Sequence, residues 1–163
     1  MLDSNNNQPV SQNNQYYISI LAFDDIEILL PQSDISSIES IYEFEKSAHK
    51  AKHLGHILNR NKKVPVYSFS SSLDLIKAYP GTRRPQCAIL KHSYGEFAIL
   101  CQDIRNTILS NIHFQNIPEC MNNNKIPLTH LCLYQETNDR QKVGMVSNAD
   151  ALYNYIKNIE GTL

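Results

Sequence analysis

The chain has 163 residues, of which 42% are apolar and 19% are charged, and its formal net charge is −1. This length allows one domain, or two small subdomains around a shared core, to fold without a metal or a disulfide. The basic residues form no stripe, because the pairs Lys62-Lys63 and Arg83-Arg84 lie far apart, so we expect no nucleic-acid partner.

Residues 1–15 are rich in Asn, Gln and Ser and carry scarcely any apolar side chain. Such a segment buries too little surface to offset the entropy of ordering it, so we expect a disordered tail. The folded domain is then expected to cover residues 16–160. It opens with two apolar runs, residues 16–23 and 26–30, separated by an acidic turn and followed by Pro31. This pattern predicts a β-hairpin.

The next segments mix helix and strand signals. SDISSIES (33–40) is expected to be extended or irregular because of its Ser and β-branched residues. Residues 44–54 carry good helix formers with one apolar face, and Gly55 after them predicts the helix end. Residues 62–69 predict a strand, at an edge or a bulge because of Pro65. Ser72–Ile76 predicts a short capped helix.

The second half of the chain repeats the β pattern and ends in a helix. Strands are expected over residues 86–92, 96–102, 107–114, 128–135 and 141–147. A final helix is expected from Ala149 to Ile159, with Asn148 as its N-cap. Its apolar stripe is predicted to consist of Leu152, Tyr155, Ile156 and Ile159. Many short strands with few helices favour a mostly β fold of barrels or a sandwich.

The cysteines indicate the cellular compartment of the protein. Cys87, Cys101, Cys120 and Cys132 show no paired spacing, and three of them lie in or beside apolar runs, where a free thiol packs as a small hydrophobe. The N-terminus lacks the pattern of a signal peptide, and no apolar run approaches the ~20 residues of a spanning helix. These features predict a soluble protein of the reducing cytosol, with no direct membrane insertion.

Sequence motifs for catalysis are missing. The five glycines lie too far apart for a phosphate-binding loop, and no G-x-S-x-G elbow occurs, so we expect a protein without catalytic activity or cofactor. A carboxylate pair drawn from Glu39, Glu43, Glu45 or Asp103 stays open as an alternative, because such pairs leave no local motif.

Three histidines raise the possibility of a metal site. His49, His53 and His56 follow one another at i, i+4 and i+7, and two histidines at i, i+4 on a helix can bind zinc. The segment H-K-A-K-H has no general-base Glu, however, and its two lysines would repel a cation. A solvated helix face is therefore favoured, and a small metal-dependent enzyme remains the alternative function.

One segment resembles a known family. Residues 54–69, LGHILNRNKKVPVYSF, carry Gly55, the turn residue Arg60 and the strand Val64-Pro65-Val66 in the order of the central signature of CheW-like domains. The segments IEILLPQSDISSI, QCAILKHSYGEFAILCQDI and VGMVSNADALYNYI resemble further parts of that family in the same order. The resemblance covers about residues 16–157.

The signature also departs from the family at several positions. Asn61 replaces the turn glycine, and Leu58-Asn59 inverts the usual order of asparagine and leucine. Ser37 stands where a glutamate is usual, Ser68 where an aspartate is common, and Gln102 where the aspartate of a "V-D-E-V" stretch is usual.

The resemblance implies a fold and a role. The fold would be two small five-stranded β-barrels of the src-homology type sharing one core, with short helices and a C-terminal helix. The protein would be a cytoplasmic adaptor that joins the cytoplasmic tip of chemoreceptors to the regulatory domain of a CheA-type histidine kinase. It would be recruited to membrane receptor arrays of a flagellar or type IV pilus system, the latter driving twitching motility. A degenerate barrel that binds a small ligand is a further alternative.

By the same resemblance, the partner-binding residues would lie in and around one turn. They would be Arg60, Asn59, Asn61, Gly55, Lys62, Val64 and Pro65. The planar guanidinium of Arg60 suits an interface contact. Its alternative role is an internal salt bridge that fixes the turn.

Overall fold

The computed structural model describes residues 14–40, 45–46, 53–78, 85–121 and 126–161. Most of the expected tail, residues 1–13, lies outside these ranges. The strands are β1 (Tyr16–Phe23), β2 (Ile26–Pro31), β3 (Ile35–Ser40), β4 (Glu45–Lys46), β5 (Gly55–Asn59), β6 (Lys62–Tyr67), β7 (Gln86–Leu90), β8 (Phe97–Cys101), β9 (Asp103–Leu109), β10 (His113–Asn116), β11 (His130–Tyr134) and β12 (Lys142–Val146). The 3-10 helix η1 (Gln32–Asp34) follows β2, and helix α1 (Ala149–Glu160) follows β12.

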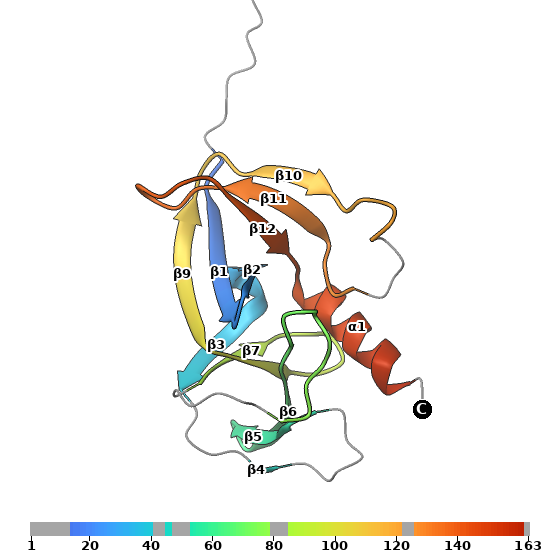
Figure 1. The fold of residues 1–163 in the computed structure, drawn as a ribbon. Coiled ribbons are helices and arrows are strands. Elements are labelled where there is room, and N and C mark those ends of the chain that lie inside the picture. Colours follow the sequence, from blue (N-terminus) through green and yellow to red (C-terminus); the bar gives the residue numbers. More distant parts are fainter. Residues whose placement is uncertain (1–13, 41–44, 47–52, 79–84, 122–125, 162–163) are drawn as a thin grey trace, which may run out of the picture.

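The described strands form two sheets, one above the other in Figure 1. Sheet A has the order β10-β11-β12-β2-β1-β9, and sheet B the order β3-β7-β8-β6-β5-β4. Neighbours are antiparallel except for β12 with β2 and β6 with β8, which are parallel. The mostly β fold with two β units is confirmed. Each unit has six strands among the described residues, where five were expected.

The buried apolar side chains that the structure describes form three clusters, one within each sheet and one between the sheets. Strand β7 contributes to two of them, because successive side chains of a strand point to opposite faces. Cys87 and Ile89 lie in the cluster of sheet B, whereas Ala88 and Leu90 lie in the central cluster with residues of sheet A and α1. A strand buried on both faces has an unbroken apolar sequence, which explains the run QCAIL.

Helix α1 packs into the central cluster. The predicted C-terminal helix is therefore confirmed. The Asn148 side chain caps it, because Oδ1 accepts a hydrogen bond from the amide of Ala151 at 2.8 Å. Asp34 of η1 adds a second cap by accepting from the amide of Ala149 at 2.9 Å. The buried side chains of the helix are Ala149, Leu152, Tyr155 and Ile156. No helix in the described part of the chain is long and apolar enough to cross a membrane.

The helix expected over residues 44–54 is wrong where the structure describes that segment. Glu45–Lys46 form β4, which pairs antiparallel with the first residues of β5. Gly55 therefore begins a strand instead of ending a helix. Strand pairing outweighs the local helix propensity at these positions. Phe44 and residues 47–52 lie outside the described residues.

The short helix expected over Ser72–Ile76 is also wrong. The chain makes a tight turn here, in which the amide of Ser70 donates to the carbonyl of Asp74 and the amide of Leu73 donates to the carbonyl of Ser70. The Ser70 hydroxyl oxygen accepts from the amides of Ser72 and Asp74. Ser side chains that bind nearby amides in this way compete with helix formation.

The single strand expected over residues 107–114 is divided in two. Strand β9 ends at Leu109 and β10 begins at His113. Between them Asn111 has a φ of 60°. Asn adopts this left-handed conformation more readily than most residues, and it breaks the strand here.

The strand containing Pro65 is confirmed, but it lies neither at an edge nor at a bulge, the two positions that were expected. Strand β6 lies between β8 and β5. Its pairing with β8 covers only Val66 and Tyr67, so on that side the ladder begins after Pro65. A proline without an amide hydrogen is therefore tolerated in an inner strand.

Candidate functional site

The turn between β5 and β6 presents two of the predicted contact residues, Arg60 and Asn61, at the surface. Asn59 pairs with Lys62, which leaves Arg60 and Asn61 as a two-residue loop. Their φ angles are 50° and 63°. Both are positive, as in the type I′ turns that suit the twist of a hairpin, although Asn-Gly is the usual sequence there. Arg60 is exposed at the tip, in a conformation that costs an L-residue roughly 1–2 kcal/mol.

A side-chain hydrogen bond fixes the hairpin. The Asn59 amide nitrogen Nδ2 donates to Glu96 Oε2 at 2.8 Å, which ties the end of β5 to the turn that leads into β8. Arg60 makes no hydrogen bond or ion pair with any residue that the structure describes. Asn59, and not a salt bridge of Arg60, therefore anchors this turn within the described part of the chain.

The other residues predicted for this site divide into exposed and buried ones. Lys62 is exposed and Pro65 is half-buried. Val64 is 2% exposed and belongs to the apolar cluster of sheet B. Gly55 is buried opposite Val66 in the β5–β6 ladder. Gly55 and Val64 therefore belong to the buried part of the hairpin, and its accessible end consists of Arg60, Asn61 and Lys62.

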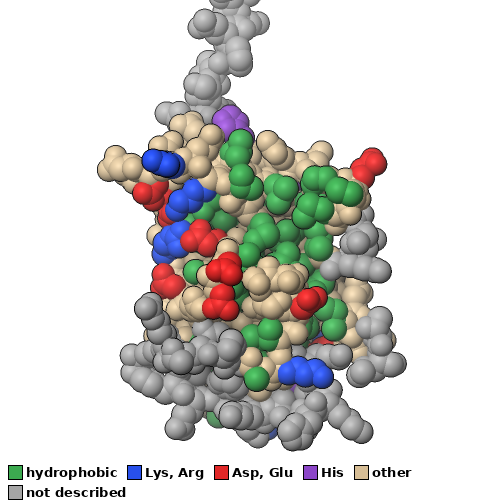
Figure 2. Space-filling model, viewed as in Figure 1, with side chains coloured by type: hydrophobic (Ala, Val, Ile, Leu, Met, Phe, Trp, Pro, Cys, Tyr) green, Lys and Arg blue, Asp and Glu red, His purple; other side chains and the backbone are tan. Residues whose placement is uncertain are grey.

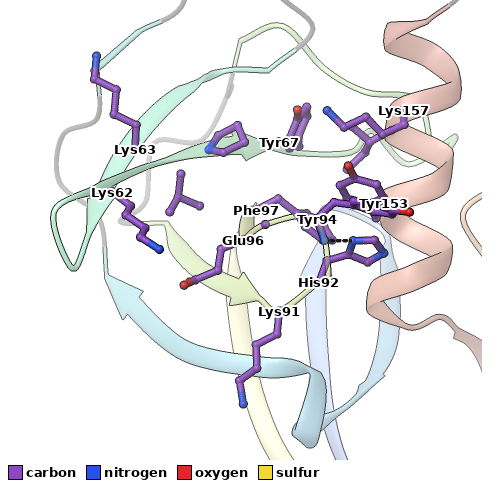
Figure 3. Close-up of a pocket in the computed structure, with 14 residues that line it drawn as sticks. Lys62, Lys63, Tyr67, Lys91, His92, Tyr94, Glu96, Phe97, Tyr153 and Lys157 are labelled. Carbon is purple, nitrogen blue, oxygen red and sulfur yellow. Dashed lines mark hydrogen bonds between the residues drawn. The ribbon is translucent and has the colours of Figure 1, made fainter.

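A cavity of about 430 Å³ opens beside the hairpin. Its lining comes from β6, from the β7–β8 turn with the start of β8, and from α1 (Figure 3). The lining residues are Lys62, Lys63, Val64, Pro65, Tyr67, Lys91, His92, Tyr94, Gly95, Glu96, Phe97, Tyr153, Ile156 and Lys157. Lys62, Val64 and Pro65 thus belong both to the predicted contact region and to this cavity.

Aromatic rings stack along one wall of the cavity. The His92 ring lies on that of Tyr153 with centroids 3.8 Å apart and planes 10° apart. The amide of Tyr94 donates to His92 Nδ1 at 3.2 Å, so the ring proton sits on Nε2, which lies 3.0 Å from Asp150 Oδ1. Contacts at both nitrogens and on the ring face fix the orientation of His92. These contacts hold this wall of the cavity in place.

The histidines considered for a metal site are only partly brought together. The rings of His53 and His56 lie 4.5 Å apart, and His49 lies outside the described residues. Burial, with a smaller effect of His56, lowers the pKa of His53. The described residues contain no group of three or more side chains placed to hold a metal ion.

The cysteine thiols in the strands are not activated. Burial raises the pKa of Cys87 to about 12 and that of Cys101 well above its usual range. A thiol in this state is protonated at neutral pH and is a poor nucleophile. Cys132, also buried, has a pKa raised for the same reason.

Sequence reasoning missed a charged network in sheet A. Arg105 on β9 donates from Nε to Glu136 Oε1 at 2.8 Å and from Nη2 to Glu27 Oε1 at 3.0 Å. The buried Tyr134 hydroxyl donates to Glu27 Oε2 at 2.9 Å, and Lys142 Nζ lies 3.2 Å from Glu136 Oε2. Since Tyr134 belongs to the sheet A cluster, the network borders that cluster. It joins β2, β9 and the β11–β12 hairpin.

An apolar surface lies on the outer side of the β11–β12 hairpin. Leu133 is paired with Val143, and Leu131 with Met145. These side chains point away from the sheet A cluster, because the alternate residues Cys132 and Tyr134 point into it. Val143 is 71% exposed. Figure 2 shows hydrophobic side chains gathered on this side of the molecule, as is typical of interaction surfaces.

The strained turn leads to a stability prediction. Arg60→Gly is expected to raise the free energy of unfolding by about 0.5–1 kcal/mol, because Gly adopts a positive φ without a steric penalty. Arg60→Ala keeps the strained backbone and should change stability little. Urea unfolding followed by circular dichroism measures both variants. A less stable Arg60→Gly protein would mean that the Arg60 side chain stabilises the fold.

Comparison with known proteins supports the fold. No protein-family model matches the sequence, and no curated protein matches it. The structure is similar to the crystal structure of the scaffolding protein TtCheW from Thermoanaerobacter tengcongensis, with a TM-score of 0.59 at 12% sequence identity. The match covers 81% of this chain and 89% of that chain. The chain therefore has a CheW-like fold.

Proposed function

We propose that this protein is a non-catalytic adaptor of a chemosensory array, which couples chemoreceptors to a CheA-type histidine kinase. The observation that carries this proposal is the fold likeness to a scaffolding protein over 81% of this chain. Two further features support it. The sequence around Arg60 partly matches the signature of CheW-like domains, and the outer side of β11–β12 exposes apolar side chains. The protein would act in the cytoplasm and reach membrane receptor arrays through its partners.

The contact with the kinase regulatory domain is proposed to run through the tip of the β5–β6 hairpin. Arg60 is exposed there, occupies a strained conformation and has no partner among the described residues. Residues kept in such conformations cluster at functional sites. Asn59 would position the tip through its bond to Glu96, and Lys62 would add a second positive charge.

The proposal is tested by reversing the charge at the tip. Arg60→Glu is expected to weaken binding to a purified CheA-type regulatory domain from the same organism by at least roughly tenfold, as for an arginine that dominates an interface. Isothermal titration calorimetry measures the dissociation constant, and circular dichroism checks the fold.

The matched control is Arg140→Glu, which makes the same charge change at an exposed position in the β11–β12 turn of sheet A. It should leave binding unchanged. Equal affinities for wild type and Arg60→Glu would remove the hairpin tip as the contact. No binding by the wild type would remove the proposed partner.

A further inference from the structure

The cavity beside the hairpin combines an apolar floor with a positively charged rim. Val64, Phe97 and Ile156 are buried residues among its lining. Four lysines also line it, namely Lys62, Lys63, Lys91 and Lys157. Glu96 is the single carboxylate among the described lining residues, so these residues carry a formal charge of +3 before the neighbouring Asp150 and Glu160 are counted, whereas the whole chain carries −1.

The acidic groups at this cavity already have partners. Glu96 accepts the hydrogen bond of Asn59, Asp150 lies against His92, and Glu160 accepts from Tyr67 at 2.6 Å and from Lys157 at 3.1 Å. By contrast, the side chains of Lys62 and Lys91 make no hydrogen bond or ion pair with any described residue. Their ammonium groups are therefore available to an external anion at little structural cost.

An exposed tyrosine completes the surface. Tyr94 is 82% exposed, and its ring lies 5.5 Å from that of His92 and 6.0 Å from that of Tyr153. Figure 3 shows the three side chains side by side between the β7–β8 turn and α1. A tyrosine held beside a rigid ring stack offers a large contact area with little further loss of entropy on binding.

We propose that this cavity binds an acidic peptide segment of a partner protein, with an aromatic or large apolar residue as its anchor. The anchor would lie over Val64 and Phe97 beside Tyr94, and flanking carboxylates would face Lys62 and Lys91. A peptide is favoured over a small molecule because the lysines come from three separate elements around an open cavity. An extended chain with several carboxylates spans that separation.

The inference rests on the proposed adaptor function only in taking the occupant to be a protein. Its decisive residues, Lys91 and Tyr94, lie outside the hairpin tip on which the kinase contact was proposed. The two proposals can therefore fail independently: Arg60→Glu tests the hairpin tip, and Lys91→Gln/Tyr94→Ala tests the cavity. Both substituted positions in the second variant are exposed, so the fold should survive.

The test is an NMR titration of the full chain, labelled with ¹⁵N, with the peptide acetyl-Glu-Glu-Phe-Glu-Glu-amide. Saturable shifts are expected at the amides of Lys62, Tyr94 and Phe97, with binding weakened roughly tenfold in Lys91→Gln/Tyr94→Ala and retained in Arg60→Glu. The same peptide with Ala in place of Phe should bind more weakly, and one with Lys in place of Glu should not bind.

Two results would overturn the inference. One is an absence of shifts at the cavity, or shifts that the double variant leaves unchanged. The other is binding of naphthalene-2-sulfonate at these amides without binding of the peptide, which would assign the cavity to small aromatic anions.

Discussion

Replacing Arg105 with Met is expected to lower the free energy of unfolding by about 2–4 kcal/mol, because it removes the cation shared by two carboxylates. Arg105 donates to Glu27 and Glu136 at 2.8–3.1 Å, and its side chain is 33% exposed. The expected loss is at the lower end for a broken buried pair, since water reaches part of the network. Met retains most of the aliphatic packing, so the loss reports mainly on the charge. Urea unfolding at pH 7 measures it.

Two controls show whether the effect comes from the ion pairs. Lys142→Met removes a more exposed cation from the same Glu136 and should cost less than about 1 kcal/mol of unfolding free energy.

The second control is the pH dependence of stability. The bond from Arg105 holds the pKa of Glu136 below its ordinary value of 4.5. A lowered folded-state pKa stabilises the protein above the unfolded pKa, and this contribution disappears as the pH falls through the folded pKa. The difference between wild type and Arg105→Met should therefore shrink below about pH 4.5. A difference constant from pH 7 to pH 3 would contradict this account.

Gly144→Ala is expected to destabilise the protein by about 1–3 kcal/mol through overpacking. A Cβ at this position in β12 would lie 2.8 Å from Tyr134 Cε1 and 2.9 Å from Cys132 Sγ. Neither neighbour can withdraw easily, because both are 1% exposed and the Tyr134 hydroxyl is bound to Glu27. Thermal unfolding followed by circular dichroism would show a lower Tm.

The neighbouring position supplies the control for this effect. Val143→Ala changes a side chain that is 71% exposed, in the same strand, and should shift stability by less than about 0.5 kcal/mol. Combining Gly144→Ala with Cys132→Ala removes the Sγ atom that the new methyl group meets, and should recover part of the loss. A Gly144→Ala protein as stable as wild type would mean that Tyr134 and Cys132 can move at no cost.

The elements that the sequence predicts well are those whose signals are local. The β1–β2 hairpin follows from two apolar runs around Asp24-Asp25, and α1 follows from Asn148 and a 3.6-residue stripe. Strands β7 and β8 also stand out, because burial on both faces makes them continuous apolar runs. In these segments propensity, pattern and tertiary packing favour the same structure.

The errors arise where a distant partner or one special residue decides the structure. Glu45–Lys46 form a strand because β5 lies alongside them, although the segment around them has good helix formers. The left-handed residues Leu73 and Asn111 end the regular structure expected at their positions. Asn tolerates a positive φ, but the residue type alone does not show that the chain adopts one at Asn111. The network of Glu27, Arg105 and Glu136 needs the register of sheet A before its members can be brought together.

The candidate site also has one part with a local sequence signal and one part that depends on distant residues. The tip of the β5–β6 hairpin stays a prediction as a contact site, which the sequence can suggest because its residues are consecutive and resemble a family signature. The cavity beside it could not be predicted, because its lining comes from β6, the β7–β8 turn and α1, which are separated by tens of residues. Lys91, Tyr94 and Tyr153 carry no motif that links them in the sequence.

The most direct test of the adaptor role is a pull-down from lysate of the cells that make this protein, with wild type and Arg60→Glu side by side. We expect mass spectrometry to identify a histidine kinase or a chemoreceptor with the wild type and to find it depleted with Arg60→Glu. Recovery of neither by the wild type would contradict the adaptor role, and equal recovery by both proteins would contradict the contact at the hairpin tip.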